Sequence, residues 1–71
     1  MKTLLQRLKP EYKAKLNIES EKYPNAVNAA IREMNENNSF LDLKYGTVQV
    51  LAMYLDLKST NITEILNLFE S

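Results

Sequence analysis

The chain has 71 residues, of which 45% are hydrophobic and 25% charged, and its nine basic residues balance nine acidic ones. Such a composition argues against disorder, and the length predicts one small domain, 1–71, with a core of marginal size. Cys, His and Trp are absent, which excludes disulfides, Cys/His zinc sites and the usual catalytic base. No run of 18 apolar residues occurs, and the N-terminal segment becomes charged too soon for a signal peptide. We expect a cytoplasmic protein without a membrane segment.

The first half of the chain predicts three helices. A short one over 3–8 places Leu4, Leu5 and Leu8 on one face. A second begins at Pro10, because proline suits the first helical turn, and it ends at about Lys22. A third runs over 24–36, where the apolar positions recur at the three- and four-residue spacing of a helix: Val27, Ala30, Ile31 and Met34.

A polar connection follows over 35–39, and Ser39 resembles an N-cap for a single helical turn that reaches Tyr45. Gly46 is the only glycine. We expect it just past a helix end with positive φ, where glycine carries no steric penalty. Thr47 is then the expected N-cap of the next helix.

Residues 48–66 read as two short helices around a tight turn. Leu51, Ala52 and Leu55 share one side of the first helix. The second has the same pattern in Ile62, Ile65 and Leu66, and the segment 56–58 is short enough to be a turn. This arrangement predicts a helix-turn-helix at about 47–69.

Individual positions in that motif carry further predictions. Ala52 allows the two helices to cross closely, Leu57 fills the angle between them, and Asp56 takes a left-handed backbone where the motif often has glycine. Either Ser59 or Asn61 caps the second helix. Two alternatives remain open: the segment is a simple helical hairpin, or the motif lies instead between residues 12 and 34.

We therefore predict an all-α fold, a compact bundle of about five short helices that contains a helix-turn-helix. Its core is expected to combine the apolar positions of every helix. The predicted core residues are Leu4, Leu8, Leu16, Val27, Ala30, Ile31, Met34, Leu43, Val48, Leu51, Ala52, Leu55, Leu57, Ile62, Ile65, Leu66 and Phe69.

The chain does not look like an enzyme. Catalysis would rest on Asp, Glu, Lys, Tyr and Ser alone, and no pair of them lies where burial would shift a pKa strongly. The spacing of Asp42, Asp56 and Glu64 matches no calcium loop. We predict no metal, no cofactor and no small-molecule substrate.

Charge distinguishes two kinds of partner. Through Ser39 the chain has seven basic and five acidic residues, whereas from Phe40 onward it has two and four. The second helix of a helix-turn-helix often enters the major groove, yet an acidic one neutralises few phosphates. Whether a basic cluster formed by Lys2, Arg7, Lys9, Lys13 and Lys15 flanks the motif is left open. The side chains expected to contact a partner protein, or DNA in the alternative, are Lys58, Ser59, Thr60, Asn61, Thr63, Glu64 and Asn67.

An acidic, polar helix face suits a basic DNA-reading surface on another protein, because opposite potentials favour encounter. Exposed rings and a methionine offer additional anchors for such a contact. The residues considered as anchors are Tyr12, Tyr23, Tyr45, Met53 and Tyr54. Each of these side chains can equally serve to cover a small core.

Residues 51–67, LAMYLDLKSTNITEILN, resemble the helix-turn-helix of phage Cro and repressor proteins. The whole chain, with its N-terminal LKPEY segment, is also similar to the small antirepressors of temperate phages, the Mor type among them. This resemblance implies a protein in the bacterial cytoplasm that binds a phage repressor and blocks its DNA-binding surface. A Cro-like sequence-specific DNA-binding repressor is the alternative, and a small inhibitor of a host enzyme is the second alternative.

Overall fold

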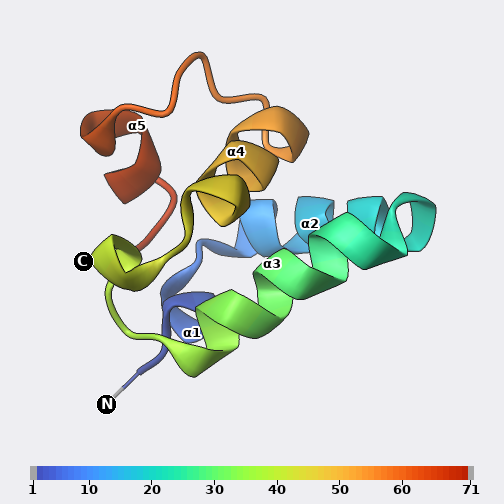
Figure 1. Ribbon diagram of the computed structural model, residues 1–71, viewed down its shortest axis with the longest axis horizontal. Coiled ribbons are helices and arrows are strands. Elements are labelled where there is room, and N and C mark those ends of the chain that lie inside the picture. The colour runs from blue at the N-terminus through green and yellow to red at the C-terminus, as the bar shows by residue number, and fades with distance from the viewer. Residues whose placement is uncertain (1, 71) are drawn as a thin grey trace.

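The computed structural model describes residues 2–70, and this part of the chain is a bundle of helices without a strand. Figure 1 shows the arrangement, in which α3 lies across the middle of the molecule. The elements are α1 (Leu4–Arg7), α2 (Pro10–Lys22), α3 (Pro24–Glu36), a 3-10 turn η1 (Phe40–Asp42), α4 (Tyr45–Tyr54) and α5 (Ile62–Leu66). The predicted all-α fold is confirmed. No helix within residues 2–70 has the length and apolar character that a membrane crossing requires.

Local sequence signals set most helix starts. Pro10 and Pro24 occupy the first turns of α2 and α3, as predicted. Thr3 forms a capping box with Gln6 at the start of α1. Ser39 accepts the backbone N–H of Leu41 and so begins η1. Thus α1 and η1 begin where a side chain accepts a free backbone N–H group, whereas α2 and α3 have no side-chain cap and begin at a proline, which has no N–H to satisfy.

The start of α4 differs from the prediction. The N-cap is Lys44, and both Gly46 and Thr47 lie inside the first turn of the helix. The expected positive φ at Gly46 is wrong, because no glycine in the described chain has one. The cap comes instead from α3: the Glu33 carboxylate accepts the backbone N–H of Lys44 at 2.6 Å and the hydroxyl of Thr47. These two hydrogen bonds hold the pKa of Glu33 below its ordinary value.

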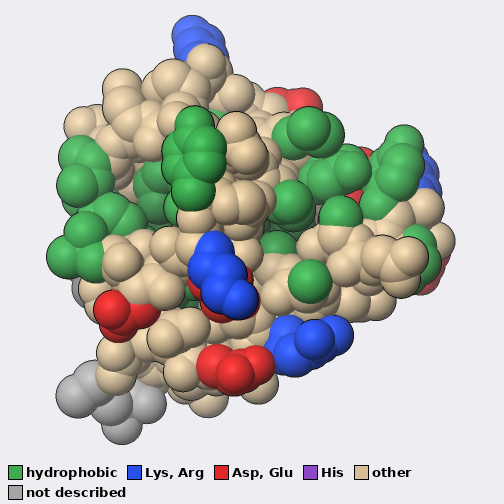
Figure 2. Space-filling view, in the orientation of Figure 1, with side chains coloured by type: hydrophobic (Ala, Val, Ile, Leu, Met, Phe, Trp, Pro, Cys, Tyr) green, Lys and Arg blue, Asp and Glu red, His purple; other side chains and the backbone are tan. Residues whose placement is uncertain are grey.

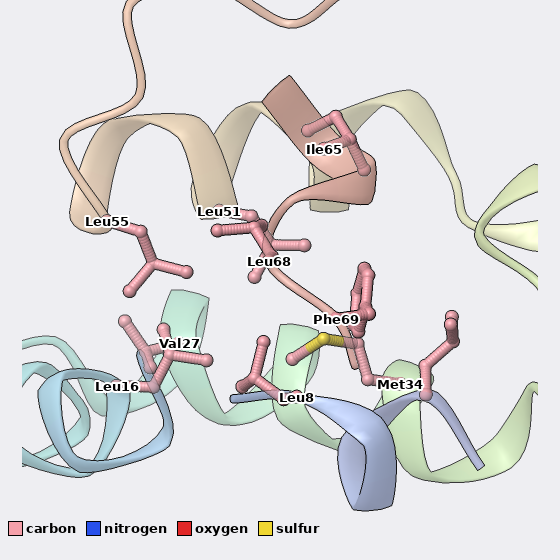
Figure 3. Packing of buried hydrophobic residues seen from close by; sticks show 10 residues of the cluster. Leu8, Leu16, Val27, Met34, Leu51, Leu55, Ile65, Leu68 and Phe69 are labelled. Atoms are coloured by element: carbon pink, nitrogen blue, oxygen red, sulfur yellow. The ribbon is translucent and has the colours of Figure 1, made fainter. Parts of the chain in front are cut away.

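The core lies where α1, α2 and α4 meet α3, and it is closed by the C-terminal segment (Figure 3). An isolated antiparallel bridge joins Leu8 to Phe69 and draws that segment against the N-terminal one. The backbone N–H of Lys9 donates to the carbonyl oxygen of Leu68 at 2.9 Å, and the backbone N–H of Glu70 donates to the carbonyl oxygen of Arg7 at 2.7 Å. The buried apolar residues are Leu4, Leu8, Leu16, Val27, Ala30, Met34, Leu51, Leu55, Ile65, Leu68 and Phe69.

Ten of these buried residues were predicted, and the exceptions cluster at the C-terminus. Ile62 and Leu66 are 55% and 49% exposed, so their assignment to the core is wrong. Leu68, which the pattern missed, is fully buried. The cause is that α5 ends at Leu66 and the chain then turns inward. The remaining predicted core residues are half-buried: Ile31, Leu43, Val48, Ala52 and Leu57.

The helix-turn-helix is not confirmed. The predicted turn had three residues, 56–58, whereas seven residues, 55–61, separate α4 from α5. Asp56 does take the predicted left-handed conformation, with φ 57°. The backbone N–H of Leu57 then returns to the Ala52 carbonyl at 2.9 Å, which closes the C-terminus of α4. Beyond this closed turn the chain is irregular, and α5 starts only where Asn61 caps it.

Candidate functional site

The seven predicted contact residues lie on α5, on its C-cap and on the connection that precedes the helix. We call residues 57–61 the arch, because they loop away from the bundle between α4 and α5 (Figure 1). The arch carries the first four of the predicted residues, and α5 with its C-cap carries the other three. All are exposed except Glu64, which is half-buried. The predicted surface is therefore accessible to a partner.

Two of these side chains shape the backbone. The Asn61 carboxamide oxygen accepts the backbone N–H of Glu64 at 3.0 Å, so the Asn61 alternative for the N-cap is the one that forms. Ser59 accepts the N–H of Asn61 at 3.3 Å and turns the chain into that cap. Ser59 and Asn61 thus position the surface, and a partner would compete with these hydrogen bonds.

The others are free to bind. Within the described chain, the side chains of Lys58, Thr60, Thr63 and Asn67 form no hydrogen bond to another residue. They offer one ammonium, two hydroxyls and one carboxamide to solvent. These four side chains are therefore polar, and only Lys58 among them carries a charge.

A hollow of about 390 Å³ lies between the arch and α4. Apolar atoms of Ala52, Met53 and Leu57 line it, and polar side chains of the arch and of α4 border it: Gln49, Lys58, Ser59 and Thr60. Met53 is 67% exposed, as expected for a predicted anchor. Protein–protein contacts combine apolar and polar groups of this kind.

Sequence reasoning missed that Gln49 borders this hollow. Gln49 precedes Met53 by one helical turn on α4, so the signal was present in the spacing. The four tyrosines predicted as anchors differ in exposure. Tyr23 and Tyr45 are exposed, whereas Tyr12 and Tyr54 are partly buried against the core. Only Met53 among the predicted anchors lines the hollow beside the arch.

The far side of the surface is also apolar. Ile62 and Leu66 are one turn apart on α5 and both are exposed. Leu41 of η1 is 75% exposed. The preceding residue, Phe40, lines a second hollow together with Leu66. Exposed branched side chains on a short helix favour an apolar partner over phosphate groups.

Two residues of the basic cluster, Lys15 and Arg7, already have partners within the chain. Lys15 forms an ion pair with Asp56 at the end of α4, so the cation that does approach the arch is already neutralised. Arg7 donates a hydrogen bond to the Asn38 carbonyl. Within residues 56–67, Lys58 is accompanied by the acidic residues Asp56 and Glu64, and Asp56 is the residue that Lys15 of α2 pairs with.

Among residues 2–70, no three acidic side chains gather closely enough to hold a metal ion. Comparison of the chain with protein-family models, with curated protein sequences and with solved structures gives no match. The geometry of the arch and the hollow is thus the basis for a functional proposal.

Proposed function

We propose that this protein is a small transcriptional regulator that acts by binding another protein, a phage-type DNA-binding repressor. Support comes from the hollow beside the arch, which is lined by the exposed Met53 and by the polar residues Lys58 and Thr60. The repressor as partner rests on the resemblance to the small antirepressors of temperate phages. In this proposal the arch covers the repressor's DNA-binding surface and so favours lytic growth.

Charge supports a protein partner rather than DNA. A DNA-binding surface needs several cations, because phosphate neutralisation provides most of the non-specific affinity. The arch and α5 carry Lys58 and Glu64, and Asp56 immediately precedes them. The exposed Ile62 and Leu66 would face phosphates on DNA but can be buried against a protein.

The test is a gel shift with DNA from the protein's own gene neighbourhood, at two salt concentrations, with and without the neighbouring repressor. We expect no shift by the protein alone and loss of the repressor's own shift when the protein is added. The variant Thr60→Lys should weaken that loss, since it adds a cation against a basic DNA-binding surface. An unchanged effect of Thr60→Lys would contradict the assignment of the arch.

Other outcomes would select the alternatives. A shift by the protein alone that weakens as salt rises would make it a Cro-like DNA binder, because phosphate contacts release counterions. Capture of a host enzyme, with no effect on the repressor, would make it an enzyme inhibitor. Either result would overturn the antirepressor proposal.

A further inference from the structure

The arch is hydrogen-bonded at its two ends. At its start the backbone N–H of Leu57 donates to the carbonyl oxygen of Ala52, and at its end Asn61 caps α5. Between these points the backbone groups of residues 58–60 form no hydrogen bond within the described chain. Figure 2 shows the arch at the top of the molecule, where a basic side chain projects into solvent. The position of the arch therefore depends on the residues at its ends.

The chain leaves α4 through Asp56, whose backbone is left-handed with φ 57°. A side chain makes this conformation less favourable, and glycine is the usual residue there. Asp56 nevertheless carries a carboxylate, and this carboxylate forms an ion pair with the ammonium of Lys15 on α2. Glycine could not make this contact. The ion pair thus gives a physical reason for an aspartate directly before the arch.

The core fixes the backbone next to both charged residues. Leu16 follows Lys15, and Leu55 precedes Asp56. Both leucines are buried in the core, where they point toward one another (Figure 3). The two backbone segments that carry the charges are therefore already in place, and pairing orders only two side chains. An exposed ion pair loses less of its small gain to conformational entropy in this situation.

We propose that Lys15 is a positioning residue for the arch. By holding the Asp56 carboxylate, it fixes the direction in which the chain leaves α4, and so it keeps the hollow between the arch and α4 in one shape. Lys15 does not line that hollow, so it acts through Asp56 and not by contact with a bound group.

This restraint affects binding at the site of the proposed function. A preformed surface loses less conformational freedom when a partner binds it. Lys15 should therefore strengthen binding of the repressor. This step rests on the proposed function, whereas the restraint on the arch is a property of the free protein.

The heteronuclear NOE of the backbone amides, measured by NMR on the free protein, tests the restraint. Lys15→Gln should lower the NOE of the amides of residues 58–60, because they gain fast motion. Lys15→Arg keeps the cation and should behave like the wild type. The matched control is Lys13→Gln, which removes the same charge from a half-buried lysine of α2. Residues two apart face different sides of a helix, so this control should leave the arch unchanged.

Two further measurements identify the ion pair as the cause. High salt should lower the NOE of the wild-type arch towards that of Lys15→Gln, whose own values should not respond to salt. Asp56→Asn keeps a residue that tolerates the left-handed backbone. Combined with Lys15→Gln it should have no additional effect, because both changes remove the same interaction.

The gel-shift assay measures the consequence for the repressor. At low salt, Lys15→Gln should be needed at about two- to fivefold higher concentration than the wild type to remove the repressor's shift, as the loss of one exposed ion pair implies. Lys15→Arg and Lys13→Gln should match the wild type. Loosening of the arch without weaker repressor binding would overturn the step from restraint to binding.

Arch amides that are unchanged in Lys15→Gln would overturn the positioning role, as would an equal loss of NOE in Lys15→Arg or Lys13→Gln. The proposed function fails in a different way, namely if the wild type leaves the repressor's shift intact. In that case the NOE comparison still decides whether Lys15 positions the arch, because it needs no partner.

Discussion

The Glu33 carboxylate on α3 accepts the backbone N–H of Lys44 at 2.6 Å, so one helix supplies the N-terminal cap of another. The same carboxylate accepts the Thr47 hydroxyl in the first turn of α4. Helix caps are usually provided by the residue just before the helix. Here the cap also fixes the position of α4 against α3, and it therefore belongs to the tertiary structure.

Glu33→Ala should lower the free energy of unfolding by about 1 kcal/mol at neutral pH, as the loss of a helix cap typically does. Urea denaturation followed by circular dichroism measures this change. Glu36→Ala, one turn later on the same helix, is the control. It should change stability little, because Glu36 is exposed. Equal losses in the two variants would contradict the capping role.

The same cap predicts a pH dependence. The hydrogen bonds from Thr47 and Lys44 lower the pKa of Glu33 in the folded state. The stabilisation is therefore complete above the pKa of the unfolded chain, about 4.3, and is lost as pH falls through the lower folded value. The difference in free energy of unfolding between the wild type and Glu33→Ala should therefore decrease as the pH falls through that range. A difference that stays constant down to pH 2 would show that the charge plays no part.

Asp56 combines a left-handed backbone, φ 57°, with an exposed ion pair to Lys15. Asp56→Gly should be more stable than Asp56→Ala by about 1 kcal/mol, because glycine takes this conformation without a steric penalty. Asp56→Asn removes only the charge and should cost less than about 0.5 kcal/mol, since exposed ion pairs contribute little. Chemical denaturation at low and high salt separates the two effects, and the loss in Asp56→Asn should vanish at high salt.

Leu66 and Leu68 test which side of the C-terminal segment faces the core. Leu68→Ala should lower the free energy of unfolding by about 3 kcal/mol, because Leu68 is fully buried and its loss leaves a cavity. Leu66→Ala, at a side chain that is 49% exposed, should cost less than about 1 kcal/mol. Thermal and urea denaturation of the pair give the comparison. The reverse order would place Leu66 in the core.

Met53 tests the hollow beside the arch. Met53→Lys should weaken binding of the repressor by at least about tenfold, because a charge replaces an apolar anchor at the centre of the contact. Ile18→Lys is the matched control, since Ile18 is similarly exposed but lies on α2. Titration of labelled repressor measures both affinities. Equal weakening by the two variants would indicate a general effect of added charge instead of a local contact.

The sequence by itself determined the features that depend on neighbouring residues. Pro10 and Pro24 begin α2 and α3 because their fixed φ suits a first turn. Ser39 and Asn61 cap the turns that follow them, and Asp56 takes the left-handed conformation. Six of the seven predicted contact residues are exposed, and Glu64 is half-buried.

Only the tertiary structure decided the start of α4 and the direction of the C-terminal segment. Glu33 is 11 residues from Lys44, so no local pattern predicts that it replaces Thr47 as the cap. The bridge between Leu8 and Phe69 ends α5 early and turns Leu68 inward, which leaves Leu66 in solvent. Helical periodicity treats a segment as one continuous helix, and contacts between distant segments decide where that helix stops.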